Sequence, residues 1–216
     1  MDMEALEKLI KGRRSIRKWK PEDVSDELLK KAVELGVWAP NGGNYQGWHF
    51  IIVKNRELIR KMADSLQSVI DKVASWPEAQ AWPEEINRYR KNGAFFRNAP
   101  VCMGVFITEY QSLMDRVLKT REAFDPEAKE ILSFRRSAPT AIQSAAAAIT
   151  TMLLVFHHFG LGACWLGAPL HAKRQIETLL GAPKNFALIG LVAVGYPDES
   201  PQIDRKPVDQ VLKFIY

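Results

Sequence analysis

The sequence predicts a single α+β domain in which helices outnumber strands and flank a few buried strands. Apolar runs of strand length occur at 99–107 and 186–197, and helix-capping signals lie between them. The composition, with 47% hydrophobic and 25% charged residues among 216, is that of a globular chain able to bury a full core. Because no repeat or clear linker interrupts the sequence, residues 1–216 form one predicted domain.

The first third of the chain predicts two helices, a loop, a strand and a third helix. A helix is expected over 4–11, and a second follows Ser25, a residue that favours the N-cap. The loop PNGGNYQG at 40–47 is rich in residues that adopt unusual backbone angles. A strand then follows at 48–54, and Asn55 can cap a helix to about residue 74. The residues expected on the buried side of the second helix are Leu28, Leu29, Ala32, Val33 and Leu35.

The rest of the chain alternates helices with apolar strands. Residues 75–98 contain two Trp-Pro steps followed by acids, which predicts two short helices in a surface insertion. After the strand at 99–107, the charged stretch to about Arg136 receives no assignment. Further predictions are a long helix at 137–159, a strand at 160–167, a helix at 171–181 stopped by Gly181, a strand at 186–197 and an apolar tail at 208–216. The four alanines at 145–148 predict that another element approaches the long helix closely.

Positive charge is concentrated near the N-terminus, although the net charge is only +5. Seven basic residues and no acid occur between positions 8 and 20: Lys8, Lys11, Arg13, Arg14, Arg17, Lys18 and Lys20. A nucleic-acid binder would spread its charge along a face, so this pattern favours a local anion site. A solvated basic loop is the alternative.

Location and membrane association are predicted from other features. The two cysteines, Cys102 and Cys164, lie apart in apolar runs and predict buried free thiols in a reducing cytoplasm. The N-terminus shows no apolar stretch typical of a signal peptide. The most apolar long stretch, 138–154, contains Thr, Gln and Ser and is too polar and short to be predicted as a membrane span.

Several common catalytic motifs are missing from the sequence. It contains no GxxxxGK[ST], GxSxG or HExxH, and GLGACWLG at 160–167 has the wrong spacing for a dinucleotide fingerprint. His157 and His158 are adjacent on a predicted helix, so they point about 100° apart and do not predict a metal site. If the chain is an enzyme, a bound cofactor is expected to supply the chemistry.

Two loops carry the strongest signals. Guanidinium groups and a hydroxyl occur together in RRSIR at 13–17, a combination that can surround one phosphate. The second loop, NGGNYQGW at 41–48, offers exposed backbone amides together with the side-chain amides of Asn44 and Gln46. An ordinary turn is the alternative for the second loop.

These motifs resemble the nitroreductase family of FMN-dependent oxidoreductases. The matching pieces are RRSIRKW, APNGGNYQGWHFIIV, GLGACWLGAP and DRKPVDQV; they occur in the family's order and span nearly the whole chain. Gly47 departs from the proline that the family usually has there, which leaves the rigidity of this loop open. The resemblance implies a nitroreductase-like fold with a central, mainly antiparallel sheet flanked by helices, in an intertwined homodimer.

The resemblance also implies which residues hold FMN. Arg13, Arg14, Ser15 and Arg17 match the motif around the phosphate, ribityl chain and ring edge, and Arg205 matches a basic residue on the same phosphate. A loop reaching FMN from the other subunit is matched by Pro40, Asn41, Gly42, Asn44 and Gln46. Gln143 matches a glutamine near the pyrimidine ring, and Leu166 and Gly167 match backbone near flavin N5.

The implied activity is ping-pong hydride transfer from NADH or NADPH, through flavin N5, to an electron-poor nitroaromatic, quinone or enone. No protein residue is expected to act as a catalytic acid, while Arg17 or another cation would stabilise the reduced flavin. Residues 75–98 are interpreted as a lid that carries Trp76, Trp82 and Tyr89, or alternatively as scaffolding. The expected partners are a second copy of the chain and a small-molecule acceptor, with neither nucleic acid nor membrane.

Three other functions stay open at this point. A reductive dehalogenase resembling iodotyrosine deiodinase would need a lid that grips an amino-acid zwitterion, for which Glu84, Glu85, Tyr89 and Lys91 are candidates. A flavin-fragmenting oxygenase is a second possibility within the same fold. A basic nucleic-acid-binding module is the non-enzyme alternative and would bind no chromophore.

Overall fold

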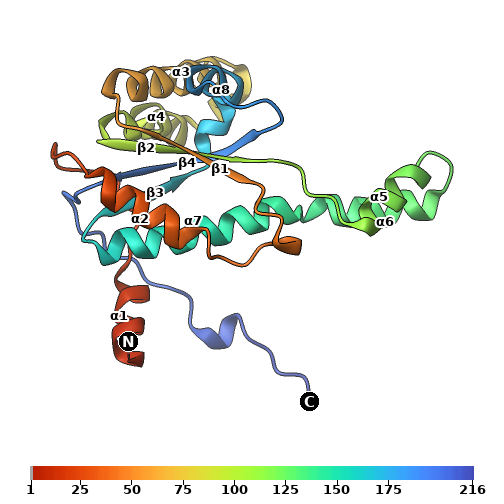
Figure 1. Cartoon of the computed structure of the whole chain (residues 1–216). Helices are drawn as coiled ribbons and strands as arrows, with labels where there is room; N and C mark the ends of the chain where they lie inside the picture. The colour runs from red at the N-terminus through yellow and green to blue at the C-terminus, as the bar shows by residue number, and fades with distance from the viewer. Residues whose placement is uncertain (1) are drawn as a thin grey trace.

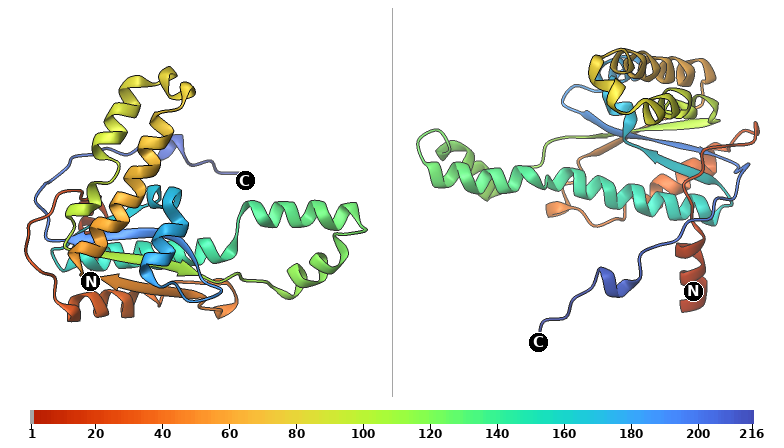
Figure 2. Two further views of the ribbon diagram at one scale, coloured as in Figure 1. Left: turned by 90° about the horizontal axis from the view of Figure 1, so that it is seen from above. Right: turned by 180° about the vertical axis from the view of Figure 1, so that it is seen from behind.

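A computed structural model describes residues 2–216 and shows an α+β fold with three layers (Figure 1, Figure 2). The central sheet contains β1 (Trp48–Val53), β2 (Val101–Ile107), β3 (Gly162–Leu166) and β4 (Ala187–Gly195). Their order is β1-β2-β4-β3, and every neighbouring pair is antiparallel. Helices α3 (Arg56–Ala74), α4 (Pro83–Asn92) and α8 (Lys173–Leu180) cover one face, and α2 (Asp26–Gly36) and α7 (Thr140–His158) cover the other. The fold class predicted from the sequence is confirmed.

Local capping rules account for several helix boundaries. The Ser25 hydroxyl accepts a hydrogen bond from the Leu28 amide at 3.4 Å, and the Asn55 side chain accepts one from the Leu58 amide at 3.0 Å. Helix α8 ends at Gly181, which has a left-handed φ of 60°. These three boundary signals lie where the sequence predicted them.

Each face of the sheet has its own hydrophobic core. The core under α3 and α8 includes Ile59 and Phe106, and the core under α2 and α7 includes Ile149 and Phe156, all of them almost fully buried. Both cysteines are buried and free, as predicted. Burial raises the pKa of the Cys102 thiol to about 12, which makes this cysteine inert.

The long helix predicted at 137–159 is present as α7, which begins three residues later and ends one residue earlier than predicted. Pro139 has no amide hydrogen, so α6 (Pro126–Ser137) ends before it and α7 begins at Thr140. Ala145 and Ala148 are buried against α2, where a Cβ at Gly36 would lie 3.4 Å from the Ala148 carbonyl oxygen. Two of the four alanines therefore serve a close helix contact within the chain.

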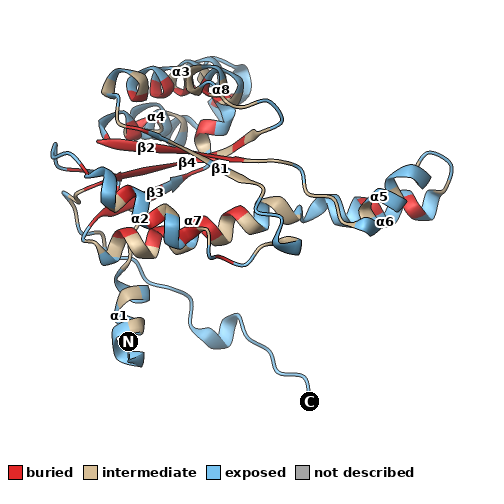
Figure 3. Ribbon diagram, in the orientation of Figure 1, coloured by how far each residue is buried: buried red, intermediate tan, exposed pale blue. Residues whose placement is uncertain are grey.

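Among the described residues, one helical stretch is long and apolar enough to cross a membrane, judged by length and composition alone. It covers 126–158, has a mean hydropathy of 1.5 over its most apolar window, and has only 33% of that window buried in the chain. Its buried side packs on α2 and the sheet, as expected of a core helix. The other side of α7 is half-buried or exposed (Figure 3), and Ile142 is 44% exposed there.

No element is predicted from the sequence over 108–136, and here the structure adds a helical hairpin. Helices α5 (Leu113–Arg121) and α6 form this hairpin, which projects away from the sheet (Figure 1, Figure 2). Its apolar side chains face solvent and are mixed with charges, so the sequence shows no core-facing stripe; Leu113, Phe124 and Phe134 are 67%, 72% and 64% exposed. The hairpin is the main element that sequence reasoning missed.

Other predicted elements need smaller corrections. The stretch 75–98 contains α4 between two 3₁₀ turns, η2 (Pro77–Ala81) and η3 (Phe95–Asn98), instead of two short helices. Leu35 was predicted to be buried but is 37% exposed. The strands predicted at 99–107, 160–167 and 186–197 begin one to two residues later and, for the last two, end one to two residues earlier.

Both ends of the described chain project from the body. Helix α1 (Met3–Gly12) contains no buried residue, although its N-cap Asp2 accepts a hydrogen bond from the Ala5 amide. The tail is extended apart from the turn η5 (Val208–Gln210), and it exposes Val211, Phe214 and Ile215. Figure 3 shows both segments almost entirely in the exposed colour. Such apolar surface on a projecting tail needs a partner.

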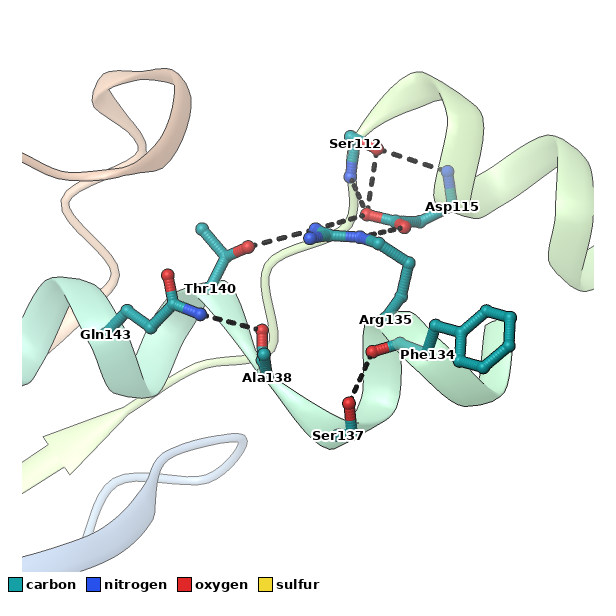
Figure 4. Close-up of polar contacts among 8 residues, drawn as sticks. All are labelled: Ser112, Asp115, Phe134, Arg135, Ser137, Ala138, Thr140 and Gln143. Carbon is teal, nitrogen blue, oxygen red and sulfur yellow. Dashed lines mark hydrogen bonds and ion pairs between the residues drawn. The ribbon is translucent and has the colours of Figure 1, made fainter. Parts of the chain in front are cut away.

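A polar network fixes the base of the hairpin to α7 (Figure 4). Arg135 donates to the Asp115 carboxylate at 3.1 Å and to the Thr140 hydroxyl at 2.9 Å. Asp115 also closes a capping box with Ser112. The Arg135 hydrogen bond and then those from Ser112 lower the pKa of Asp115 to about 2. Asp115 is therefore ionised over the whole neutral and mildly acidic range.

We expect Asp115→Asn to loosen the hairpin. Amide hydrogen exchange within 113–137 should become about tenfold faster, equivalent to ~1.4 kcal/mol of local stability. Glu130→Gln on the same hairpin, a residue with no ion pair within residues 2–216, is the matched control and should leave exchange unchanged. Equal exchange in the wild type and Asp115→Asn would show that the network does not hold the hairpin.

The contribution of Asp115 to the stability of the fold depends on pH. Its pKa is depressed from 3.8 to about 2, so its stabilisation is complete above 3.8 and disappears as the pH falls toward 2. The difference in thermal midpoint between the wild type and Asp115→Asn should therefore shrink from pH 5 toward pH 2. A difference that stays constant over that range contradicts this assignment.

Candidate cofactor and substrate site

The RRSIR loop is fixed along the edge strand β3. Ser15 forms a parallel bridge with Ala163, and the Ile16 amide donates to the Ala163 carbonyl at 3.1 Å. Further along, the Lys20 amide donates to the Tyr196 carbonyl at 3.0 Å, and the buried Trp19 indole donates to the Gly162 carbonyl at 2.9 Å. This ordered attachment is unlike a freely solvated basic loop.

Several cations gather at the C-terminal end of α7. Arg13, Arg14 and His157 line a hollow of about 230 Å³, and one acid, Glu199, also lines it. Burial, followed by the charges of Arg205 and Arg14, lowers the pKa of Arg13. Burial and then Arg13 and Arg14 likewise lower the pKa of His157. An anion placed among these groups would offset their mutual repulsion.

The polar partners of this cluster leave room for an anion. Within residues 2–216, no ion pair joins Arg13, Arg14 or Arg205 to an acidic side chain. Arg14 donates to the backbone carbonyls of Lys11 and Arg13 at the end of α1, while its buried Nε has no partner. A phosphate group fits this donor set, because guanidinium groups recognise its oxygens.

Glu199 organises the next part of the loop. Its carboxylate accepts hydrogen bonds from the backbone amides of Arg17 and Lys18. The Arg17 guanidinium donates to the Ser15 carbonyl at 3.3 Å and lies 5.9 Å from the centre of the Phe95 ring. Sequence reasoning missed Glu199 because it lies 182 positions from Arg17 in a segment without a motif.

A second and larger cavity of about 1270 Å³ lies between β3 and α4. Arg17, Leu166 and Gly167 line one part of it, and Trp82 and Tyr89 line another. A Cβ at Gly167 would meet nothing within 4 Å, so the backbone there is open to a ligand. The structure thus brings the predicted flavin-edge residues and two predicted lid residues to one cavity.

The third predicted lid residue is placed differently. Trp76 precedes η2, is 48% exposed and does not line this cavity. Phe96 belongs to the buried core, and Phe95 stacks at 6.1 Å on Trp19. Part of the aromatic content of 75–98 is therefore structural, while Trp82 and Tyr89 remain available to a ligand.

The loop at 40–47 lies at the opposite end of α7, near its N-terminus (Figure 1). Gly43, Asn44 and Gln46 have φ values of 59°, 51° and 51°, which confirms the prediction of unusual backbone angles. The Asn41 side chain accepts a hydrogen bond from the Gln46 amide at 3.0 Å, and the Gly42 amide donates to the Ser144 hydroxyl at 3.2 Å. Left-handed angles at non-glycine residues are costly and cluster at functional sites.

The side chains of this loop face outward from the chain. Pro40, Asn44 and Gln46 are exposed, and within residues 2–216 neither amide side chain makes a hydrogen bond. A Cβ at Gly47 would lie 2.4 Å from the Tyr45 ring, so the ring occupies space that a larger residue would need. Gln143 is exposed on α7 and donates to the Ala138 carbonyl at 3.0 Å (Figure 4).

The predicted cofactor residues therefore form two groups in one chain. Gln143 and His157 mark the two ends of α7, and their separation of 14 positions corresponds to roughly 21 Å of helix. The arginine cluster and cavity lie at one end, and the 40–47 loop lies at the other. A single chain does not bring the two groups together.

Comparison with known proteins shows which family the chain belongs to. The sequence profile described as "Nitroreductase family" matches residues 10–196. The chain belongs to the nitroreductase family. An Archaeoglobus fulgidus protein whose provisional name is NADH dehydrogenase/NAD(P)H nitroreductase is 27% identical over 91% of this chain and 88% of its own length. Iodotyrosine deiodinase of Hydra vulgaris is 24% identical over 93% of this chain and 69% of its own length.

Solved structures of nitroreductase-like proteins have the same fold. A BluB-like flavoprotein from Clostridium difficile 630 is 31% identical over 100% of both chains, with a TM-score of 0.85. A nitroreductase with bound FMN from Desulfitobacterium hafniense DCB-2 is 23% identical over 100% of both chains, with a TM-score of 0.74. The chain is accordingly a member of a family of flavin oxidoreductases.

The left-handed loop residues allow a test of functional strain. Gln46→Gly should leave the free energy of unfolding unchanged or raise it by up to about 1 kcal/mol, because glycine adopts φ 51° freely. Thermal unfolding measures this change. The substitution should also raise the Kd for FMN by about tenfold, because the side-chain amide is lost. Asn185→Gly, at φ 71° outside the loop, is the control and should affect stability alone. Loss of stability with unchanged FMN affinity would contradict a ligand-binding role for Gln46.

Proposed function

We propose that the protein is an FMN-dependent oxidoreductase that uses NADH or NADPH to reduce an electron-poor organic acceptor such as a nitroaromatic, quinone or enone. The observation that carries the proposal is the cluster of Arg13, Arg14 and Arg205, which form no ion pair within residues 2–216, beside a cavity with open backbone at Gly167. A ligand with a phosphate joined by a chain to a flat ring suits this site, with the phosphate at the arginine cluster and the ring in the cavity. FMN is favoured over FAD because a terminal phosphate is held by several arginines, which leaves little room for an adenylate.

The residues present fit FMN in distinct ways. Arg13 and Arg205 would hold the phosphate, with Arg14 and Ser15 completing the loop around it. Arg17 would place its positive charge at the pyrimidine edge of the ring, where it favours added electron density. Leu166 and Gly167 would offer backbone to the ring, and Trp82 and Tyr89 would exclude water from its open side.

The chemistry follows from these roles. When bound, FMN supplies a two-electron carrier that accepts hydride from NAD(P)H and passes it to the acceptor. For a nitro group, one such cycle consumes one NAD(P)H and one proton and yields a nitroso group and water. The chain binds and orients the reactants, holds a cation near the growing negative charge and excludes water, and no side chain needs to act as a nucleophile. This is why no catalytic dyad is required.

We further propose that the working unit is a homodimer with FMN between the two chains. An antiparallel arrangement of two α7 helices would set the 40–47 loop and Gln143 of one chain beside the arginine cluster of the other. The half-buried outer side of α7, on which Ile142 is exposed, and the projecting α1 and tail supply the surface for such a contact. The site would then be complete only in the dimer. A cytoplasmic location fits the two free thiols.

Reductive dehalogenation of an iodinated aromatic amino acid is the second candidate. It is favoured by the likeness to iodotyrosine deiodinase and by the position of Glu85 and Tyr89 at the cavity. Iodide release from 3-iodotyrosine under anaerobic reduction tests it. If the protein reduces nitroaromatics but releases no iodide, the second candidate function is rejected and the first is supported.

The purified protein should be yellow and bind about one FMN per chain. Arg13→Ala and Arg205→Ala should each weaken FMN binding by ~1.5–3 kcal/mol, the usual value of a hydrogen bond to a charged group. Riboflavin, which has no phosphate, should lose much less affinity. Fluorescence titration with both ligands measures this, and Lys20→Ala, in the same basic run, is the control. Failure of the wild type to bind FMN would refute the proposed function. Equal losses of affinity for FMN and riboflavin would show that these arginines do not contact the phosphate.

A further inference from the structure

The large cavity has an excess of positive charge. Six basic residues line it against two acids, Glu85 and Glu199, and Glu199 already accepts two backbone hydrogen bonds. The basic residues are Arg17, Lys18, Arg88, Arg90, Lys91 and Arg97. Arg90 is paired with Asp71 at 3.0 Å and Arg97 with Asp64 at 3.0 Å. Arg88 and Lys91 have no ion pair among residues 2–216.

These two free cations lie together on α4. They are three residues apart, a spacing that places side chains on neighbouring positions of one helix face. Both line the cavity, and a carboxylate can accept hydrogen bonds from a guanidinium and an ammonium group placed side by side. Glu85 lies three residues before Arg88 on the same helix but forms no ion pair with it within residues 2–216, so both cations are free to bind an anion.

Aromatic rings line the same cavity. Trp82 and Tyr89 come from the same segment as the cations, and Trp165 comes from β3. These three rings are 59%, 40% and 37% exposed, so each presents surface that a ligand can cover. Flat faces of this kind hold a planar ring by stacking or edge contacts. The volume of about 1270 Å³ exceeds the roughly 300–1,000 Å³ of an ordinary ligand pocket, which leaves room for a second ring beside a cofactor ring.

We infer that the acceptor is a planar aromatic compound bearing a carboxylate, which Arg88 and Lys91 bind while Trp82, Tyr89 and Trp165 hold the ring. This inference rests on the proposed function and deepens it by naming the substrate class. Arg88 and Lys91 are specificity-determining residues, because they contact the charged substituent and not the group that is reduced. The same cations could instead bind the 2′-phosphate of NADPH, and the experiment separates these two sources of negative charge.

The test compares two acceptors with the same nitro-substituted ring, the anionic 4-nitrobenzoate and its uncharged methyl ester, using the FMN-loaded full chain. With NADH as reductant, kcat/KM for the wild type should favour the carboxylate by about tenfold. Arg88→Ala/Lys91→Ala should abolish this preference and leave turnover of the ester within about twofold. Lys30→Ala, which removes a charge on α2 outside the cavity, should preserve the preference. The ratio of the two acceptors within one preparation does not depend on the folded fraction of the variant.

A charge reversal and a change of reductant complete the experiment. Arg88→Glu/Lys91→Glu should favour a nitroaromatic bearing a trimethylammonium group over 4-nitrobenzoate. If the variants instead raise KM for NADPH but not NADH and keep the carboxylate preference, the cations serve the reductant and the inference is overturned. If the yellow wild-type protein reduces both acceptors with equal kcat/KM, the inference is also overturned, but the proposed function is not affected. A colourless protein that reduces neither acceptor refutes the proposed function and this inference together.

Discussion

The length of helix α7 is the constraint on which the site depends. Its C-terminal end supports the arginine cluster, and its N-terminal end carries Ser144, which binds the Gly42 amide of the 40–47 loop. The helix is rigid and one face of it is buried against α2 and the sheet, so the two ends cannot approach each other. If both groups of residues bind one cofactor, they must come from two chains. A symmetric pair of α7 helices running in opposite directions satisfies this requirement with a single interface.

The surface of the chain is consistent with such a pair. Many of the exposed large apolar residues lie on segments that project from the body, which are α1, the α5–α6 hairpin and the tail. Figure 3 shows these segments largely in the exposed colour. Each would bury its apolar side chains only against another molecule, and burial of apolar area is the main driving force for association. The Arg135–Asp115 network gives the hairpin a fixed direction from the body, which is useful only if the hairpin contacts something there. We therefore interpret these segments as contacts of the proposed dimer.

The parts predicted correctly from the sequence depend on local physical rules. Ser25, Asn55 and Gly181 act through hydrogen bonds or backbone angles within a few residues of themselves, so their effect can be inferred without the fold. The left-handed angles of the 40–47 loop were predicted for the same reason. The RRSIR loop was recognised by its chemistry, although its attachment to β3 was not foreseen.

The elements and residues that were not predicted from the sequence depend on tertiary contacts, which leave no local sequence pattern. The α5–α6 hairpin faces solvent with its apolar side chains, so it lacks the periodic stripe of a helix packed on a core. Glu199 and Arg88 gain their roles from where the chain returns in space, and Trp76 and Trp82 have the same sequence context but different surroundings. In each case the tertiary fold decides which of several similar residues faces the cavity.

Subunit complementation tests the central claim of a site shared between two chains. One variant, Arg13→Ala, damages the phosphate half, and the other, Asn44→Ala/Gln46→Ala, damages the loop half. A heterodimer of the two, isolated by two affinity tags, contains one doubly damaged site and one site built from intact halves. It should bind about one FMN per dimer with wild-type affinity, whereas each variant homodimer binds weakly at both sites. A heterodimer with no wild-type site would show that each chain builds its site alone and would contradict the account.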